Sequence, residues 1–274
     1  MKMPQVQIFE RFVVTTSHKP RRKQIEIAKK LSKDLGVDYV PRRALSEIMK
    51  KGEVDFYYVV ERDGRIVIRW KEGEFFFHPA TAKVRMRNLN AGGKDYLIES
   101  LKLEGYETVL DVTFGLGAEA ILIAHFLPKG KVIGLEKSIH VYRVVRWGIE
   151  NYVSKTDWIN DALKRITVIN ADFREYIKDL EDDSVDVVYC DPMFENPVYE
   201  SNSINPIRPF ASYDTLDKDD LKEMLRVAKK RVVIKSHIKD TLFKKLGIEK
   251  FTGSKGSGVI YATIEKLQPS CLCD

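Results

Sequence analysis

Residues 248–267 read IEKFTGSKGSGVIYATIEKL, and this stretch decides the fold of the chain. The Gly/Ser-rich run at 252–258 separates two short segments that read as strands, and no helix lies between them. Two strands joined by a short turn pair as an antiparallel hairpin. We therefore expect the chain to close its sheet with antiparallel strands.

The region before this hairpin alternates between strands and helices. Strands dense in Val and Ile, each followed by a helix, are typical of a parallel sheet covered on both faces. We therefore expect an α/β fold with a doubly wound, mostly parallel sheet and an antiparallel closing hairpin. The expected strands are 108–114, 131–136, 166–170, 185–191 and 231–236, and the expected helices are 118–127, 139–153, 173–179, 218–230 and 239–246.

A smaller α/β unit precedes the alternating region. Its pattern predicts a hairpin at 54–70, joined at the Asp-Gly pair 63–64, which is a strong turn signal. The other elements expected there are strands at 9–16 and 74–79 and helices at 22–35 and 44–51, followed by a helical link near 94–103. We expect a small basic domain at 1–90, a larger domain at 91–267 and a C-terminal tail at 268–274.

Composition narrows the class of protein. The chain has 274 residues, of which 44% are hydrophobic and 31% charged, enough for one sizeable domain and a smaller one. No apolar run approaches the roughly 18 residues of a membrane span, and a cytoplasmic protein is expected. The three cysteines form no disulfide framework. Cys190 is expected in a buried strand, and Cys271 and Cys273 lack the partners of a metal site, so no metal is expected.

The positive charge is concentrated near the N-terminus. Residues 1–50 hold 12 Lys and Arg against 5 Asp and Glu, whereas the remainder holds 34 against 35. The excess includes Arg21, Arg22 and Lys23, and such a local surplus suits the phosphate backbone of a nucleic acid. The alternative is a solvated helix start and loop.

The stretch VLDVTFGLGAEA (109–120) suggests a nucleotide site. Asp111 lies late in a strand, and Gly115 and Gly117 form the turn before a helix that begins at Ala118. Glycines there let the backbone approach a ligand closely, next to the free N–H groups of the helix N-terminus.

Two further carboxylates end the next strands. Glu136 could accept the hydroxyls of a ribose, and Asp172 the amino group of an adenine whose face Phe173 covers. Each acid could instead cap a helix. Three of them at successive strand ends favour a nucleoside, and the loop G-L-G-A-E-A leaves NAD as a competitor.

The stretch VVYCDPMF (187–194) ends the fourth strand. Asp191 and the Pro192 carbonyl could accept both N–H bonds of an exocyclic amine, and Phe194 could stack on its ring. Such an amine is a poor nucleophile, so these contacts would activate it. The alternative is a plain strand end with an apolar plug. Together with the third carboxylate and the hairpin, this motif favours S-adenosylmethionine over NAD.

The motifs VLDVTFGLGAEA, VVYCDPMF and RVAKKRVVIK resemble the RsmJ/YhiQ-type 16S ribosomal RNA guanine-N2 methyltransferases, a class I methyltransferase family. The likeness covers about residues 75–262. It includes TAKVRMRNLNAGGKD (81–95), with Arg85 and Arg87 as candidate RNA contacts. The resemblance implies S-adenosylmethionine as cofactor, ribosomal RNA as partner, and cofactor contacts at Ala118, Glu119, Glu136, Lys137, Asp172 and Asp191.

The chain departs from this family at two places. The family usually has Arg-Asp after G-L-G, where this chain has Ala118 and Glu119, and the segment 195–216 has fewer positive charges than the family's. Methylation of a small-molecule or protein amine, or a non-catalytic nucleic-acid-binding relative, stays open as an alternative. Further candidate RNA contacts are Tyr199, Arg208 and Lys235, and Lys235 could also be a solvated strand end.

Overall fold

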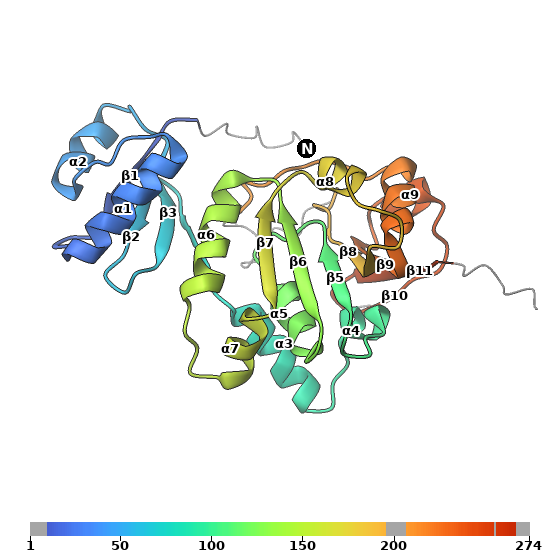
Figure 1. Ribbon diagram of the computed structural model, residues 1–274. Coiled ribbons are helices and arrows are strands. Elements are labelled where there is room, and N and C mark those ends of the chain that lie inside the picture. The colour runs from blue at the N-terminus through green and yellow to red at the C-terminus, as the bar shows by residue number, and fades with distance from the viewer. Residues whose placement is uncertain (1–9, 196–206, 255, 267–274) are drawn as a thin grey trace, which may run out of the picture. The chain divides into compact units, whose positions relative to one another are not determined.

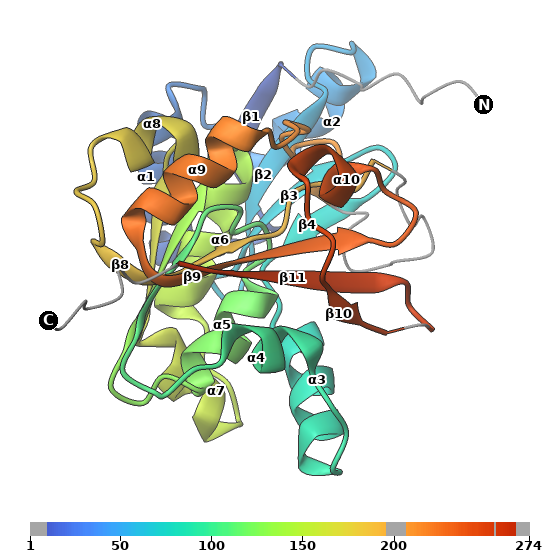
Figure 2. The same ribbon diagram turned by 90° about the vertical axis from the view of Figure 1, so that its right-hand side faces the viewer.

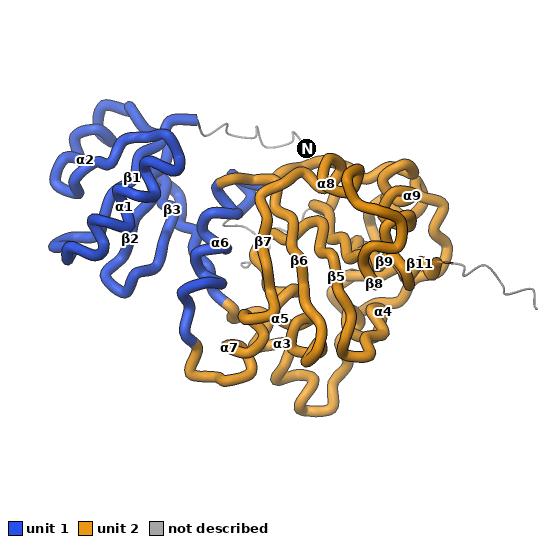
Figure 3. Tube along the Cα trace, in the orientation of Figure 1, with its two compact units in different colours: residues 1–78, 140–153, 201–211 blue, residues 79–139, 154–200, 212–274 orange. Residues whose placement is uncertain are grey.

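The computed structural model describes residues 10–195, 207–254 and 256–266. Contacts along the chain divide it into two compact units (Figure 3). Unit 1 comprises residues 1–78, 140–153 and 201–211, and unit 2 comprises residues 79–139, 154–200 and 212–274. No helix of the described residues is long and apolar enough to cross a membrane.

Unit 2 contains a sheet of seven strands in the order β10-β11-β9-β8-β5-β6-β7 (Figure 1). Neighbours from β9 to β7 are parallel, whereas β11 is antiparallel to both β9 and β10. This arrangement confirms the expected parallel sheet with its closing hairpin. The strands are β5 (Thr108–Asp111), β6 (Lys131–Glu136), β7 (Ile166–Asn170), β8 (Val185–Cys190), β9 (Ala228–His237), β10 (Thr252–Gly253) and β11 (Val259–Glu265).

Helices cover both faces of this sheet (Figure 2). On one face lie α3 (Ala80–Asn90), α4 (Tyr96–Leu101), α5 (Ala118–His125) and α7 (Asp157–Leu163). On the other face, α8 (Phe173–Lys178), α9 (Lys218–Val227) and α10 (Leu242–Leu246) pack on a core that includes Val188, Cys190 and Ile234. Cys190 is buried, as predicted. Each large side chain buried there stabilises the fold by about 1.5–3 kcal/mol.

Unit 1 contains a sheet in the order β1-β2-β3-β4, in which only the first pair is parallel. Helix α6 belongs to this unit from His140 onward. The Tyr58 hydroxyl lies 2.8 Å from His140 Nδ1, and Trp147 Nε1 donates to the Gly64 carbonyl at 2.8 Å. The elements are β1 (Phe12–Thr16), α1 (Arg22–Leu35), α2 (Arg42–Lys50), β2 (Phe56–Val60), β3 (Ile66–Trp70), β4 (Glu74–Phe76) and α6 (Ile139–Asn151).

Two helices were not expected from the sequence. Helix α3 occupies most of the segment 81–95, whose charges and glycines hid the pattern. Helix α7 has only seven residues, too few for a clear apolar period. Strand β10, the first strand of the expected hairpin, is short: its two residues pair with β11.

Phe114 explains why residue 134 is glycine. Its ring is buried and lies where a Cβ atom on Gly134 would be, and it would stand 2.7 Å from a Cβ atom on Gly117. The ring thus fills the space between strand β6 and the turn that precedes α5.

We expect Gly134→Ala to lower the free energy of unfolding by about 1–3 kcal/mol, because the added methyl group must displace the Phe114 ring. Urea unfolding measures the change. Gly256→Ala is the matched control, since the nearest atom to its Cβ would be 3.7 Å away. Equal stability of the two variants would contradict this account of Phe114.

Candidate active site

The turn after β5 brings a buried carboxylate beside two glycines. Asp111 is 1% exposed, and its Oδ1 accepts the Thr113 N–H at 3.1 Å. Gly115 and Gly117 have φ angles of 53° and 71°, in the left-handed region that favours glycine. Burial raises the pKa of Asp111 well above its ordinary value, which favours a neutral acid.

Glu136 connects this turn to the next strand end. Its carboxylate accepts the Gly115 N–H at 2.9 Å and the Ser138 N–H at 2.7 Å. Burial raises the pKa of Glu136, although these two hydrogen bonds work in the opposite direction. The carboxylate keeps lone pairs for further donors, such as hydroxyl groups of a ligand.

Asp172 ends the row of acids. Its Oδ1 accepts the Arg174 N–H at 3.0 Å, so Asp172 is the N-cap of α8, and its remaining lone pairs are still available to a ligand. Lys137 lies 2.9 Å from the same carboxylate. Burial opposes ionisation of Asp172, but Lys137 and Arg174 outweigh it and lower its pKa. Phe173 is half-buried beside it, with the Arg174 guanidinium 5.0 Å from its ring centre.

Asp191 lies at the end of β8. Its N–H donates to Thr113 Oγ1 at 2.6 Å, which ties the end of β8 to the end of β5. Its Oδ2 accepts a hydrogen bond from Lys235 Nζ at 2.6 Å. The two side chains are only 18% and 10% exposed. The solvated alternative for Lys235 is therefore wrong.

A chain of ion pairs continues from Lys235. Its ammonium lies 3.3 Å from Glu119, and Arg85 lies 3.1 Å from the same carboxylate. Arg85 also donates twice to Asp95, both times at 2.8 Å. We call Asp95, Glu119, Asp191, Arg85 and Lys235 the buried ionic layer.

Glu119 is the centre of the buried ionic layer. Burial works against its ionisation, but Lys235 and Arg85 outweigh burial and lower its pKa to about 2. No pattern in the sequence predicts that Asp95 and Arg85 meet Glu119. The contact needs α3 and α4 to lie beside α5, which no local pattern indicates.

The candidate RNA contacts differ in how far they are exposed to solvent. Arg85 and Lys235 lie in the buried ionic layer, whereas Arg87 is exposed on α3. Arg21, Arg22 and Lys23 are exposed at the start of α1 in unit 1. Arg208 is half-buried in a turn of unit 1, and Tyr199, Cys271 and Cys273 lie outside the described residues.

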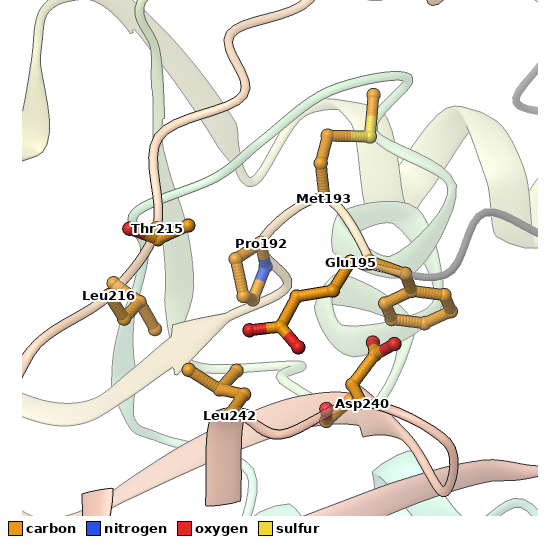
Figure 4. A pocket seen from close by; sticks show the side chains of 9 residues that line it. Pro192, Met193, Glu195, Thr215, Leu216, Asp240 and Leu242 are labelled. Atoms are coloured by element: carbon orange, nitrogen blue, oxygen red, sulfur yellow. The ribbon is translucent and has the colours of Figure 1, made fainter. Parts of the chain in front are cut away.

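A small hollow lies beside the Asp-Pro motif. Figure 4 shows the Met193 side chain pointing away from the carboxylates of Glu195 and Asp240. Glu195 accepts the Thr241 N–H at 2.8 Å and pairs with Lys245 at 2.6 Å. The hollow is lined by Pro192, Met193, Phe194, Glu195, Thr215, Leu216, Ser236, Asp240 and Leu242.

The family model described as "Putative SAM-dependent methyltransferase" matches residues 59–248, more than half of the chain. The chain belongs to this family. S-adenosylmethionine is its cofactor, and the seven-stranded sheet is that of class I methyltransferases.

The relatives of this methyltransferase differ in sequence identity and in the share of each chain that the match covers. It is 38% identical over 239 residues to the "Uncharacterized protein YpiP" of Bacillus subtilis (strain 168), covering 86% of this chain and 92% of that protein. It is 30% identical over 168 residues to ribosomal RNA small subunit methyltransferase J of Coxiella burnetii (strain Dugway 5J108-111), covering 58% of this chain and 62% of the relative. It therefore spans less than two thirds of that relative's length.

A solved structure shares the fold of this methyltransferase. It is that of the SAM-dependent methyltransferase NGO1261 from Neisseria gonorrhoeae. The TM-score is 0.61 at 16% identity, covering 92% of this chain and 95% of that one.

The strand ends of the methyltransferase fit S-adenosylmethionine. The two positive-φ glycines leave room at the turn, Glu136 keeps free lone pairs, and Asp111 is buried close by. These groups are hydrogen-bond acceptors and backbone donors of the kind that a nucleoside with an amino-acid tail needs.

We expect Glu136→Ala to weaken S-adenosylmethionine binding at least tenfold in isothermal titration calorimetry. A charged hydrogen bond is worth about 1.5–3 kcal/mol, and each 1.4 kcal/mol is about tenfold in affinity. Glu175→Ala is the control, because Glu175 is exposed on α8 and pairs with Lys178. Unchanged affinity in Glu136→Ala would show that its carboxylate does not hold the cofactor.

Proposed function

We propose that this methyltransferase transfers a methyl group to the exocyclic amine of a guanine in ribosomal RNA. One observation carries the proposal: the carboxylate of Asp191, a rigid Pro192 and the ring of Phe194 follow one another at the end of β8. The partial match to ribosomal RNA small subunit methyltransferase J supports the choice of ribosomal RNA.

Asp191 would orient the acceptor. The lone pair of an exocyclic amine is delocalised into the ring, so the nitrogen is a weak nucleophile. Hydrogen bonds from its two N–H groups to Asp191 and to the Pro192 carbonyl would favour the geometry in which the lone pair points at the methyl carbon. As the N–C bond forms, the nitrogen becomes cationic and its proton leaves through the Asp191 carboxylate.

The cofactor would lie over the ends of β5, β6 and β7. When bound, S-adenosylmethionine supplies the methyl group, and the electrons of the broken C–S bond remain on sulfur. Glu136 would hold the ribose, and Asp172 with Phe173 would hold the adenine. The backbone of the Gly115–Gly117 turn would approach the cofactor closely. The remaining proposed contacts are Asp111, Ala118, Glu119 and Lys137.

Phe194 would support the acceptor base. Its ring is half-exposed and lies 5.9 Å from the His237 ring, centre to centre. A base turned out of an RNA helix can stack on such a surface. The edge of the base would then face the small hollow beside Phe194.

A second candidate is methylation of a small-molecule or protein amine. Two carboxylates, Glu195 and Asp240, lie in the hollow, and carboxylates suit an amine that carries positive charge. This candidate requires no RNA affinity, so the two can be separated.

Asp191→Asn should lower methyl transfer by about 10²–10⁴-fold, because the amide accepts hydrogen bonds more weakly and cannot take the proton. The assay follows labelled methyl groups into small-subunit ribosomal RNA from a strain that lacks this gene, with mass mapping of the nucleosides. S-adenosylmethionine affinity and the melting temperature check that the variant is folded.

Asp161→Asn, an exposed change near Lys164, is the control for that assay. Methylation of any nucleoside position other than a guanine exocyclic amine would contradict the proposed target. Full activity of Asp191→Asn would contradict the role of Asp191.

Replacing Arg21, Arg22 and Lys23 by glutamine should weaken binding to ribosomal RNA fragments and flatten its salt dependence. Each lost phosphate contact reduces the slope of log K against log salt by about 0.9. Fluorescence anisotropy at several salt concentrations measures both effects. A triple change of the exposed Lys129, Lys131 and Lys164 is the control, and an equal loss there would contradict an RNA site in unit 1.

A further inference from the structure

Lys235 forms ion pairs with two carboxylates and is largely shielded from solvent. Its Nζ lies 2.6 Å from Asp191 and 3.3 Å from Glu119, and its side chain is 10% exposed. A buried ammonium in this position cannot reach a phosphate without breaking both ion pairs. The RNA contact expected from the sequence therefore gives way to another role.

We propose that Lys235 is a positioning residue for methyl transfer, which holds Asp191 ionised and in a fixed orientation as the acceptor of the substrate N–H groups. This role rests on the proposed function for its meaning in catalysis, but the ion pair itself can be tested without any substrate.

The need for a cation follows from the burial of Asp191. Burial raises the pKa of this carboxyl group, Lys235 works against that rise, and Glu119 adds to it. A protonated carboxyl group has an O–H donor and would present it to an N–H donor. Without the ammonium, Asp191 would therefore lose the acceptor that the reaction needs.

The neighbouring elements place Lys235 between its partners. Strand pairing sets Lys235 opposite Tyr261 of β11, while Asp191 follows directly after β8. Glu119 faces it from the first turn of α5. Arg85 from α3 shares Glu119 with Lys235 and is itself held by Asp95, the N-cap of α4.

This geometry gives the two partners of Lys235 opposite effects on Asp191. Removing the ammonium leaves Asp191 buried beside a like charge on Glu119. Removing the Glu119 charge leaves Asp191 as the sole carboxylate partner of the ammonium among the described contacts of Lys235. The first change must raise the pKa of Asp191 and the second must lower it.

The experiment follows the Asp191 side chain directly. Protein labelled with ¹³C in the aspartate Cγ atoms is titrated by NMR, and the Asp191 signal is assigned by its loss in Asp191→Asn. We expect its midpoint to move to higher pH in Lys235→Gln, to stay near the wild-type value in Lys235→Arg, and to move to lower pH in Glu119→Gln. Lys129→Gln, an exposed lysine in unit 2, should leave it unchanged.

The positioning role predicts a matching effect on rate. With saturating cofactor and small-subunit ribosomal RNA, Lys235→Gln should lose at least tenfold in kcat at neutral pH and recover part of it as the pH rises. Its Kd for S-adenosylmethionine should stay within about threefold of wild type, and Lys235→Arg should retain more activity than Lys235→Gln.

Three outcomes would overturn the proposal: an Asp191 midpoint that does not move in Lys235→Gln, one that rises in Glu119→Gln, or a loss in kcat that is independent of pH. If Lys235→Gln does not fold, the direction of the shift in Glu119→Gln still decides. Absence of activity on RNA in the wild type, with the midpoints as expected, would instead contradict the proposed substrate and leave the ion-pair assignment standing.

Discussion

The hydrogen bond from the Asp191 N–H to the Thr113 hydroxyl is the contact on which the site depends. The parallel register sets Asp111 opposite Tyr189, so the residues two positions further on, Thr113 and Asp191, meet where both strands end. The glycine turn leaves β5 at the same point. This bond and the neighbouring one from the Val112 N–H to the Tyr189 carbonyl, at 3.0 Å, together hold the cofactor side of the site next to the proposed acceptor side.

The buried ionic layer extends this constraint across the sheet. Asp191 is fixed by its backbone to Thr113, and its side chain is fixed by Lys235. Lys235 is fixed in turn by Glu119, which begins the helix after the glycine turn. A displacement of α5 would therefore change the position of Lys235, and through it the orientation of the Asp191 carboxylate.

The sequence predicted the parts of the site that follow from strand ends. Asp111, Glu136, Asp172 and Asp191 each close a Val/Ile-rich strand, and parallel strands bring their carboxyl ends to one edge. The closing hairpin was equally predictable from the sequence, because the short Gly/Ser-rich turn between its strands leaves no room for a helix. These features need only local pattern and the rules of sheet topology.

The sequence could not predict contacts made by side chains from distant elements. Arg85 lies in a helix whose polar sequence hid it, and its partners Asp95 and Glu119 are 10 and 34 residues away. The sequence places Lys235 near the end of a strand, where a solvated lysine is common. The joining of α6 to unit 1 through Tyr58 and His140 depends in the same way on a contact across 82 residues.

Stability does not explain why five ionisable groups are kept together in the buried ionic layer. Removing charges from water costs several kcal/mol per ion, and apolar replacements of buried ion pairs are often neutral or stabilising. The core around Val188 and Ile234 follows the apolar solution. Buried carboxylates with a cationic partner occur elsewhere in unit 2, as Glu107 with Lys230 and Asp220 with Arg174 show, but each of those has one cation. The buried ionic layer instead joins five groups where β8 and β9 reach the carboxyl edge of the sheet, beside Asp191. Such an arrangement suits the proposed reaction, which needs a carboxylate that is both buried and charged, since burial alone would favour a neutral Asp191.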